Sequence, residues 1–278
     1  MGTIYEKLYK FFVRNKMTLT GNKVQKGKVN YEYWTEKDNL GDYLSFVVYR
    51  YMLSRKNLSE NSFATYTCHL LGIGSVIAEK PFDAVIWGSG IHTIVKQYLL
   101  YRWKNIVKYD IRAVRGPLTQ NILLRCGYEC QNVKLGDPAV LMPYIYMPNS
   151  WTKRYKVSII NHHSIKNELE NINNIDICTK DYEHVIDEIV ASELIISSSL
   201  HGIILAETYG VPAVFVSENG KMYSEIIKYY DWYFATNRTT VVMATTVEEA
   251  LNVTPMPLPD LSHMQNDLLN SFPYDLWK

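Results

Sequence analysis

The stretch LIISSSLHGIILAETYGVPAVFV, residues 194–216, decides the fold. Residues 194–196 form a short apolar run bounded by serines, which is typical of a buried parallel strand. Residues 203–209 then place apolar side chains over a broad face of a helix, which Gly210 and Pro212 end. A second apolar run follows at 213–216. The pattern therefore predicts strand, turn, helix and strand, the repeating unit of a parallel α/β sheet.

His201 lies in this unit where the carboxyl end of a strand meets the amino end of a helix. Open parallel sheets bind ligands at this edge, and the free N–H groups of a helix favour anions. The serines before His201 lack the GxSxG pattern of a nucleophile and have no clear orienting acid nearby. We therefore expect Ser198, Ser199 and Gly202 to cap the helix and bind an anion. The alternative is a capped turn with a structural histidine.

Composition narrows the class of protein. The chain has 278 residues, 47% hydrophobic and 21% charged, which suits one large or two ordinary globular domains. A net charge of +1 does not favour nucleic acid as a partner. No apolar run reaches the roughly 18 residues that span a membrane. The sequence has no signal peptide pattern, and its four cysteines have no zinc spacing, so we expect a cytoplasmic protein with reduced thiols and no metal.

The first 30 residues carry an excess of positive charge, with seven Lys or Arg against one Glu. Ile4, Leu8, Phe11 and Phe12 follow the spacing of one apolar helix face. Such a helix either docks on the domain with a solvated basic face or contacts an anionic membrane surface or a lipid diphosphate. We keep both interpretations.

The strand and helix pattern occurs on both sides of a linker. Strands are predicted at 70–76, 83–87, 108–115 and 132–138, then at 156–160 and 175–178, with helices near 44–52, 117–123 and 182–191. A stretch rich in proline and polar residues, 143–154, separates the two sets. The sequence therefore predicts two Rossmann-like parallel-sheet domains, 1–145 and 155–278, that face each other across a cleft.

Several polar or glycine-bearing turns follow the predicted strands or precede a helix. Asn39, Gly41 and Asp42 stand just before the expected helix start, where Asp42 either accepts hydrogen bonds from a sugar or caps the helix. Gly88, Ser89 and Gly90 lack the spacing of a dinucleotide fingerprint. Arg112 and Arg115 flank another strand end, and guanidinium groups bind carboxylates and phosphates. His162 follows the strand at 156–160 and is predicted to face the cleft.

These motifs occur in a fixed order that resembles the polysaccharide pyruvyl transferase family from about residue 37 to 234. The segments are Asn39-Leu40-Gly41-Asp42, Trp87-Gly88-Ser89-Gly90, Arg112-Ala113-Val114-Arg115-Gly116-Pro117, Gly136-Asp137-Pro138, Ser198-Ser199-Leu200-His201-Gly202 and Lys228 to Asp231. The resemblance implies a fold like that of GT-B glycosyltransferases. It also implies transfer of pyruvate from phosphoenolpyruvate, as a co-substrate and without a cofactor, onto two hydroxyls of a hexose. The products are a cyclic ketal and phosphate.

The resemblance also implies roles for the candidate residues. His201 and Asp42 are the expected catalytic pair, and the first domain, with Asn39, Gly41, Gly88, Ser89 and Gly90, is the expected acceptor side. The second domain is the expected donor side. Donor-binding candidates are Arg112, Arg115, His162, Ser198, Ser199, Gly202 and Lys228. Many family members have an arginine where this chain has Ser199, so Arg112, Arg115 or Lys228 is expected to replace its charge.

The resemblance implies that the acceptor is a surface-polysaccharide precursor carried on a polyprenyl diphosphate, which would place the protein at the cytoplasmic face of the membrane. Two rival functions are kept. A GT-B glycosyltransferase that uses a nucleotide sugar would have the same fold. A non-catalytic glycan-binding protein is allowed by Ser199 and by a content of 22 Tyr and 6 Trp.

Overall fold

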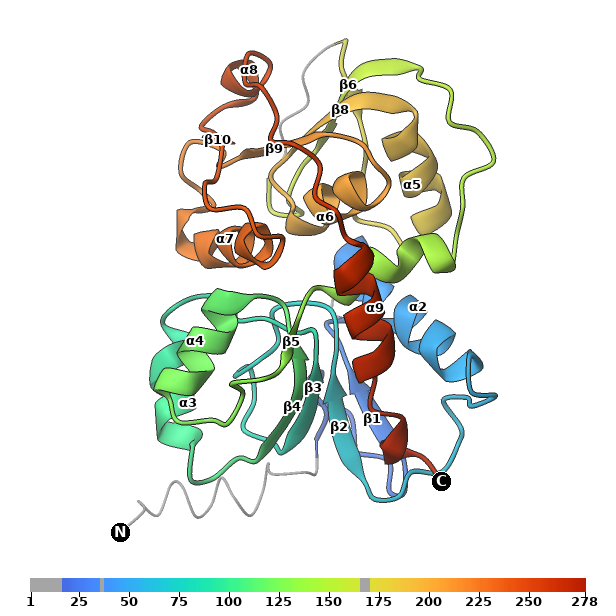
Figure 1. Cartoon of the computed structure of the whole chain (residues 1–278), viewed down its shortest axis with the longest axis vertical. Coiled ribbons are helices and arrows are strands. Elements are labelled where there is room, and N and C mark those ends of the chain that lie inside the picture. Colours follow the sequence, from blue (N-terminus) through green and yellow to red (C-terminus); the bar gives the residue numbers. More distant parts are fainter. Residues whose placement is uncertain (1–16, 36–37, 166–170) are drawn as a thin grey trace.

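The computed structural model of the chain describes residues 17–35, 38–165 and 171–278. It contains two five-stranded sheets, one above the other, and every strand pairing within each sheet is parallel (Figure 1). The first sheet has the order β1 (Val29–Glu32), β2 (Cys68–Leu71), β3 (Ala84–Trp87), β4 (Tyr109–Val114), β5 (Lys134–Leu135). The second has the order β10 (Met243–Ala244), β9 (Ala213–Val216), β8 (Ser192–Ser197), β6 (Tyr155–Ile160), β7 (Asn173–Asn174). The predicted α/β class with two parallel sheets is confirmed.

Helices cover both faces of the first sheet. Leu70 and Val85 belong to the apolar core shared with α2 (Leu40–Ser54) and α9 (Ser262–Ser271). Their neighbours Leu71 and Ile86 belong to the separate core under α3 (Lys96–Trp103) and α4 (Pro117–Arg125). This alternation is the two-residue period of a strand, and burial on both faces explains why β3 is apolar throughout.

The second sheet is also covered on both faces. Ile160 and Phe215 pack with α5 (Tyr182–Val190), α6 (Leu200–Thr208) and α7 (Ile226–Ala235). Ile159 and Val214 pack on the opposite side with the short α8 (Val247–Ala250). The strand order places β6 between β7 and β8. From β6 the chain adds β7 on one side, and it then crosses to add β8, β9 and β10 on the other side, so the strand order reverses between β6 and β8. Ligands of open α/β sheets bind at this type of switch point.

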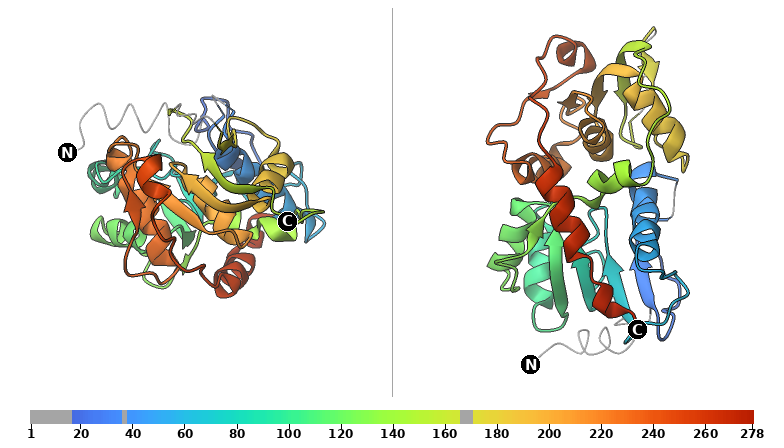
Figure 2. Two further views of the ribbon diagram at one scale, coloured as in Figure 1. Left: turned by 90° about the horizontal axis from the view of Figure 1, so that it is seen from above. Right: turned by 45° about the vertical axis from the view of Figure 1, so that its right-hand side comes forward.

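The two sheets share one continuous core. The 3-10 helix η1 (Pro138–Tyr144) follows β5, buries its first five residues and packs against α2, α6 and α9. The chain end then returns to the first sheet: α9 packs on β5 and β4, and the Trp87 indole N–H donates to the Leu268 carbonyl at 3.2 Å. Figure 2 shows α9 running from the junction along the first sheet. The predicted domain 155–278 included this segment, whose contacts are with the first sheet.

Three local predictions differ from the structure. The strand predicted at 175–178 is instead the pair Asn173–Asn174, because the ladder with β6 ends there. The helix predicted to follow Asp42 begins at Leu40, so Asp42 lies in its first turn. β1, at Val29–Glu32, was not predicted, because its four residues give too short a pattern to stand out beside the basic segment 1–30. The proposed apolar face of residues 4–12 lies outside the described residues.

Within the described ranges, no helix combines the length and the apolar character needed to cross a bilayer.

Candidate active site

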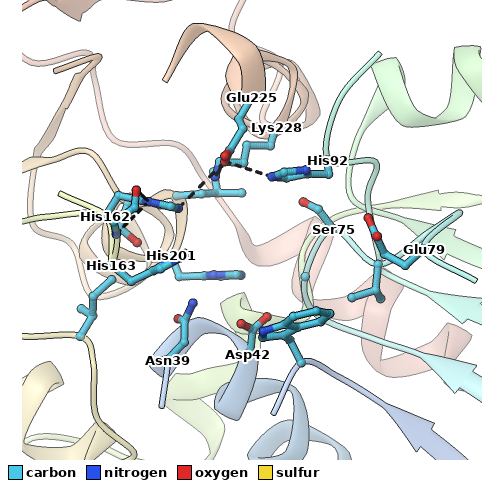
Figure 3. Close-up of a pocket in the computed structure, with 17 residues that line it drawn as sticks. Asn39, Asp42, Ser75, Glu79, His92, His162, His163, His201, Glu225 and Lys228 are labelled. Carbon is cyan, nitrogen blue, oxygen red and sulfur yellow. Dashed lines mark hydrogen bonds and ion pairs between the residues drawn. The ribbon is translucent and has the colours of Figure 1, made fainter. Parts of the chain in front are cut away.

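A cavity of about 400 Å³ opens between the two sheets, and both halves of the chain line it (Figure 3). The first half contributes the start of α2, the loop 74–79 and His92. The second half contributes residues 162–164, the start of α6, and Glu225 and Lys228, which flank the start of α7. The cavity therefore lies at the carboxyl ends of the strands, where β6 and β8 form the switch point of the second sheet.

Serine hydroxyl groups hold the ends of β6 and β8 together. The Ser197 Oγ donates to the Ile160 carbonyl at 2.9 Å, and the Ser198 Oγ accepts from the His162 backbone N–H at 2.9 Å. Ser199 is the N-cap of α6, with its Oγ accepting from the Gly202 N–H at 3.5 Å. These bonds fix the two turns that carry His162 and His201. Of the residues predicted to cap the helix, Ser199 does so, whereas Ser198 holds the turn at His162.

His201 lies between the two halves. A Cβ built on Gly41 would come within 2.0 Å of the His201 Nδ1, so only glycine at position 41 leaves room for the ring. The Nε2 of His201 lies 3.7 Å from the Oδ2 of Asp137, which is fully buried. Neither atom has a hydrogen-bond partner, and 3.7 Å is too long for such a bond. Asp137 thus supplies a negative charge directly behind the imidazole.

Asp42 faces the same cavity from below His201 in Figure 3. It is not the N-cap of α2, because the Asn39 side chain accepts from the Gly41 N–H at 3.0 Å and fills that role. Burial raises the pKa of Asp42 to about 6, although the nearby charges of His201 and Lys228 act in the opposite direction. A carboxyl group with this pKa exchanges protons readily near neutral pH.

Nitrogen atoms converge on one oxygen of Glu225 across from Asp42. The Lys228 ammonium group pairs with the Glu225 Oε2, the His92 Nε2 lies 3.2 Å from it, and the His162 Nε2 lies 4.0 Å from it. Burial alone would raise the pKa of Glu225, but hydrogen bonds from His92 and Lys228 and the charge of Lys228 hold it well below its usual range. A carboxylate therefore already occupies the point where these nitrogens meet.

Two members of this cluster have lowered pKa values of their own. Burial, then the charge of Lys228, lowers the pKa of His162 to about 3, so this imidazole is neutral at physiological pH. The Ser164 N–H donates to the His162 Nδ1 at 3.4 Å, which leaves Nε2 as the N–H directed at Glu225. Burial also lowers the pKa of Lys228, although Glu225 opposes the shift.

The structure does not bring Arg112 to the cavity. Its guanidinium group binds Asp110 at 2.7 Å and Asp275 at 2.8 Å, so two carboxylates already neutralise it on the first sheet. Both contacts raise the pKa of Arg112 above its already high value. The predicted role of Arg112 in donor binding has no support in this geometry.

Arg115 also has no place on the cavity wall, because it is fully buried behind it. It pairs with Asp231 at 3.3 Å and donates to the Ser75 Oγ at 2.7 Å and to the Ile91 carbonyl at 3.1 Å. Asp231 in turn accepts from the N–H groups of residues 118 and 119 at the start of α4. This network joins the two halves and holds Ser75, which does line the cavity.

The Gly88-Ser89-Gly90 turn, predicted to bind the acceptor, is a buried support. The Ser89 Oγ donates to the Gly74 carbonyl at 2.9 Å, and a Cβ on Gly90 would meet the Arg115 guanidinium. Gly88 adopts a φ of +88° against Pro138. The turn therefore positions the loop 74–76 from behind. Ser198 and Gly202 likewise lie behind the wall, whereas Asn39, Asp42, His162, Ser199, His201 and Lys228 line it.

Several lining residues had no role in the sequence prediction. These residues are Ser75, Glu79 and His92, which lie in loops, and Glu225, which ends the 3-10 helix η2 (Tyr223–Glu225). Asp137 was quoted only within a motif, although a Gly-Asp-Pro turn after a strand does indicate this edge of the sheet. Among the residues that the structure describes, no group of three His, Cys, Asp or Glu side chains has an arrangement that could hold a metal ion.

Comparisons with known proteins place these motifs in a wider context. Residues 39–220 match the family model described as polysaccharide pyruvyl transferase. Over 212 residues the chain is 27% identical to the uncharacterised protein L143 of Acanthamoeba polyphaga mimivirus, covering 72% of this chain and 71% of that protein. Over 215 residues it is 29% identical to the succinoglycan biosynthesis protein ExoV of Rhizobium meliloti, covering 72% of this chain and 62% of that protein. A solved structure of an uncharacterised Klebsiella pneumoniae protein aligns with a TM-score of 0.49 and 17% identity, over 88% of this chain and all of that one.

Proposed function

The chain belongs to the polysaccharide pyruvyl transferase family, and on this premise we propose that it transfers the pyruvyl group of phosphoenolpyruvate onto two hydroxyls of a hexose in a surface-polysaccharide precursor. The products are a cyclic ketal and inorganic phosphate. The name of the relative ExoV, a succinoglycan biosynthesis protein, supports a polysaccharide as the acceptor class. The match spans 62% of that relative, so the acceptor of this chain is itself a proposal.

One observation carries the proposal: a single cavity combines a cluster of nitrogen donors with a pair of groups able to move protons. Lys228, His92 and the amino end of α6 offer positive charge or N–H groups to a carboxylate or a phosphate. His201 and Asp42 face the same space from opposite halves. A small dianion held between them would lie within reach of both. Lys228 is proposed as the cation that compensates for Ser199, because it lines the cavity whereas Arg112 and Arg115 do not. Its ion pair with Glu225 would have to open or be shared when the donor binds.

The reaction needs one proton delivered and two hydroxyl protons removed. Protonation of the methylene carbon of phosphoenolpyruvate creates positive charge at C2, which the first hydroxyl attacks with loss of its proton. The C2–O bond to phosphate then breaks, and the second hydroxyl closes the ring as its proton leaves with the phosphate. The two hydroxyl protons are thus accounted for: one replaces the proton given to the methylene carbon, and the other leaves on the phosphate. Positioned general acid–base groups contribute roughly 10²–10⁴-fold to such steps.

Within this scheme Asp42 accepts the proton of the attacking hydroxyl. Its raised pKa of about 6 makes it a better base than an ordinary aspartate. His201 delivers the proton to the methylene carbon or holds the departing phosphate. The buried Asp137 carboxylate behind the ring stabilises the protonated imidazole in either role.

The second half, which contributes His162, His201 and Lys228, is proposed as the donor side, and the first half as the acceptor side. The acceptor sugar is proposed to be carried on a polyprenyl diphosphate at the cytoplasmic face of the membrane. Such a carrier would bring both a hydrophobic tail and a diphosphate close to the cavity mouth.

His201→Ala tests the proposal. The purified variant and the parent are incubated with phosphoenolpyruvate and candidate hexose acceptors, and phosphate release is followed. Mass spectrometry then detects an acceptor that gains one pyruvate less one water. The matched control is His263→Ala, since the His263 side chain is 88% exposed on α9, outside the cavity.

We expect H201A to lose at least ~10²-fold in turnover and H263A to retain it. Turnover of H201A within a few-fold of the parent contradicts the role of His201. A thermal shift with nucleotide sugars and none with phosphoenolpyruvate would instead support a GT-B glycosyltransferase.

A further inference from the structure

The outer face of α3 carries an exposed apolar stripe. Ile94 and Val95, in the turn before the helix, are 62% and 72% exposed, and Tyr98 and Tyr101 on the helix are 63% and 71% exposed. Residues 94, 98 and 101 have the i, i+4, i+7 spacing of one helix face. Single exposed apolar residues are ordinary on a protein surface, whereas a stripe of four on one short segment indicates a contact surface.

The chain segment that carries this stripe is rich in positive charge. Between Asp83 and Asp110 it has no Asp or Glu, while it has Arg102, Lys104 and Lys108, and also Lys96, which pairs with Glu79. The neighbouring α4 also has no acidic residue and ends in the exposed Arg125. The Arg102 guanidinium lies over the Tyr98 ring, 5.5 Å from its centroid, so cation and aromatic group share one face. This charge is complementary to an anionic surface.

We propose that the outer face of α3, together with Ile94 and Val95, docks on an anionic phospholipid surface. Aromatic side chains with a polar tip, next to Lys and Arg, are the residues that lie at the headgroup level of a bilayer. Each Lys or Arg near an anionic leaflet adds about 1 kcal/mol of attraction.

The position of the stripe links it to the cavity. His92 lines the cavity and contacts Glu225, and Ile94 lies two residues further along the chain. Lys96, the first residue of α3, binds Glu79 at 2.9 Å, and Glu79 also lines the cavity. A bilayer against α3 would therefore lie beside the cavity mouth. The link between the bilayer and the cavity rests on the proposed function, because only a lipid-linked acceptor gives a reason for it. The docking of α3 on the bilayer does not depend on the proposed function.

The test is flotation of the full chain with vesicles of equimolar phosphatidylglycerol and phosphatidylcholine, and with phosphatidylcholine vesicles alone. The variant is Tyr98→Ser with Tyr101→Ser. The matched control is Phe63→Ser with Tyr66→Ser, a pair that is 67% and 54% exposed before β2. Circular dichroism and the melting temperature verify that each variant is folded.

We expect the parent and the control to float with the anionic vesicles, and Y98S/Y101S to lose about tenfold in partition coefficient. Arg102→Glu with Lys104→Glu should lose at least ~30-fold on anionic vesicles and nothing on phosphatidylcholine vesicles. Absence of parental binding to anionic vesicles, or equal binding by Y98S/Y101S, overturns the proposal. A parental dimer in sedimentation that Y98S/Y101S abolishes assigns the stripe to a second copy and also overturns it. Phosphate release with a water-soluble acceptor, measured on the same variants, should remain at the parental level and reports separately on the proposed function.

Discussion

Replacing Asp42 by asparagine should stabilise the protein while it removes activity. Burial raises the pKa of Asp42 from 3.8 to about 6, so the folded state pays to keep this carboxylate ionised at neutral pH. A shift of one pKa unit corresponds to about 1.4 kcal/mol, and solvent reaching Asp42 reduces the total. We therefore expect Asp42→Asn to raise the free energy of unfolding by ~1–2 kcal/mol at pH 8, or the melting temperature by about 2–8 °C.

The pH dependence identifies the cause. Because the folded pKa is raised, the native state binds the proton more tightly, so stability from this group is greatest below pH 3.8 and is lost as the pH rises through about 6. The gain of Asp42→Asn should thus fall to less than half at pH 4.5. Asp38→Asn is the control, since the Asp38 side chain is 60% exposed. A variant that is less stable than the parent at pH 8, or a gain that is equal at both pH values, would refute the reasoning.

Three further perturbations have specific expected outcomes. Asp231→Asn leaves the buried Arg115 without its charge partner and should cost ~3–5 kcal/mol of stability, seen in urea unfolding; a loss below 1 kcal/mol contradicts a buried ion pair at this junction. Gly41→Ala should displace the His201 ring and lower turnover at least tenfold while the melting temperature changes little; unchanged turnover means that the ring has another resting position. His162→Gln should reduce the loss of stability between pH 6.5 and 4. The pKa of His162 is about 3 in the folded state, so in this pH range the imidazole gains a proton only on unfolding, which favours the unfolded state. An unchanged pH profile contradicts burial of this ring.

The sequence predicted the elements that carry strong local signals. The strands β3 and β9 are apolar and buried throughout, and β6 and β8 bury their last three residues, so burial and composition agree there. β4 buries only Ala113 and Val114. The two-residue strands β7 and β10 have no comparable run and exist because a neighbouring strand pairs with them. The sequence of α9 did not indicate which sheet it packs against, because its partner, the first sheet, lies more than 100 residues earlier in the chain.

The predicted residues that line the cavity stand at a strand end or near a helix start. His162 and His201 were found because the ends of parallel strands meet at one edge. Arg115 also follows a strand, but its partner Asp231 lies 116 residues away, so its burial has no local signature. Glu225 and His92 come from different halves, which only the packed structure brings together.

The return of the chain end to the first sheet has a consequence for biosynthesis. The first sheet is fully synthesised at Leu135, whereas the C-terminal segment that packs on it extends to the 3-10 helix η3 (Tyr274–Leu276). At roughly 5–20 residues per second, about 7–28 s of translation separate the two. During that interval the face of the nascent sheet that α9 covers, including Trp87, stays open to water and to chaperones. The first half of this protein therefore completes its fold last, although a ribosome makes it first.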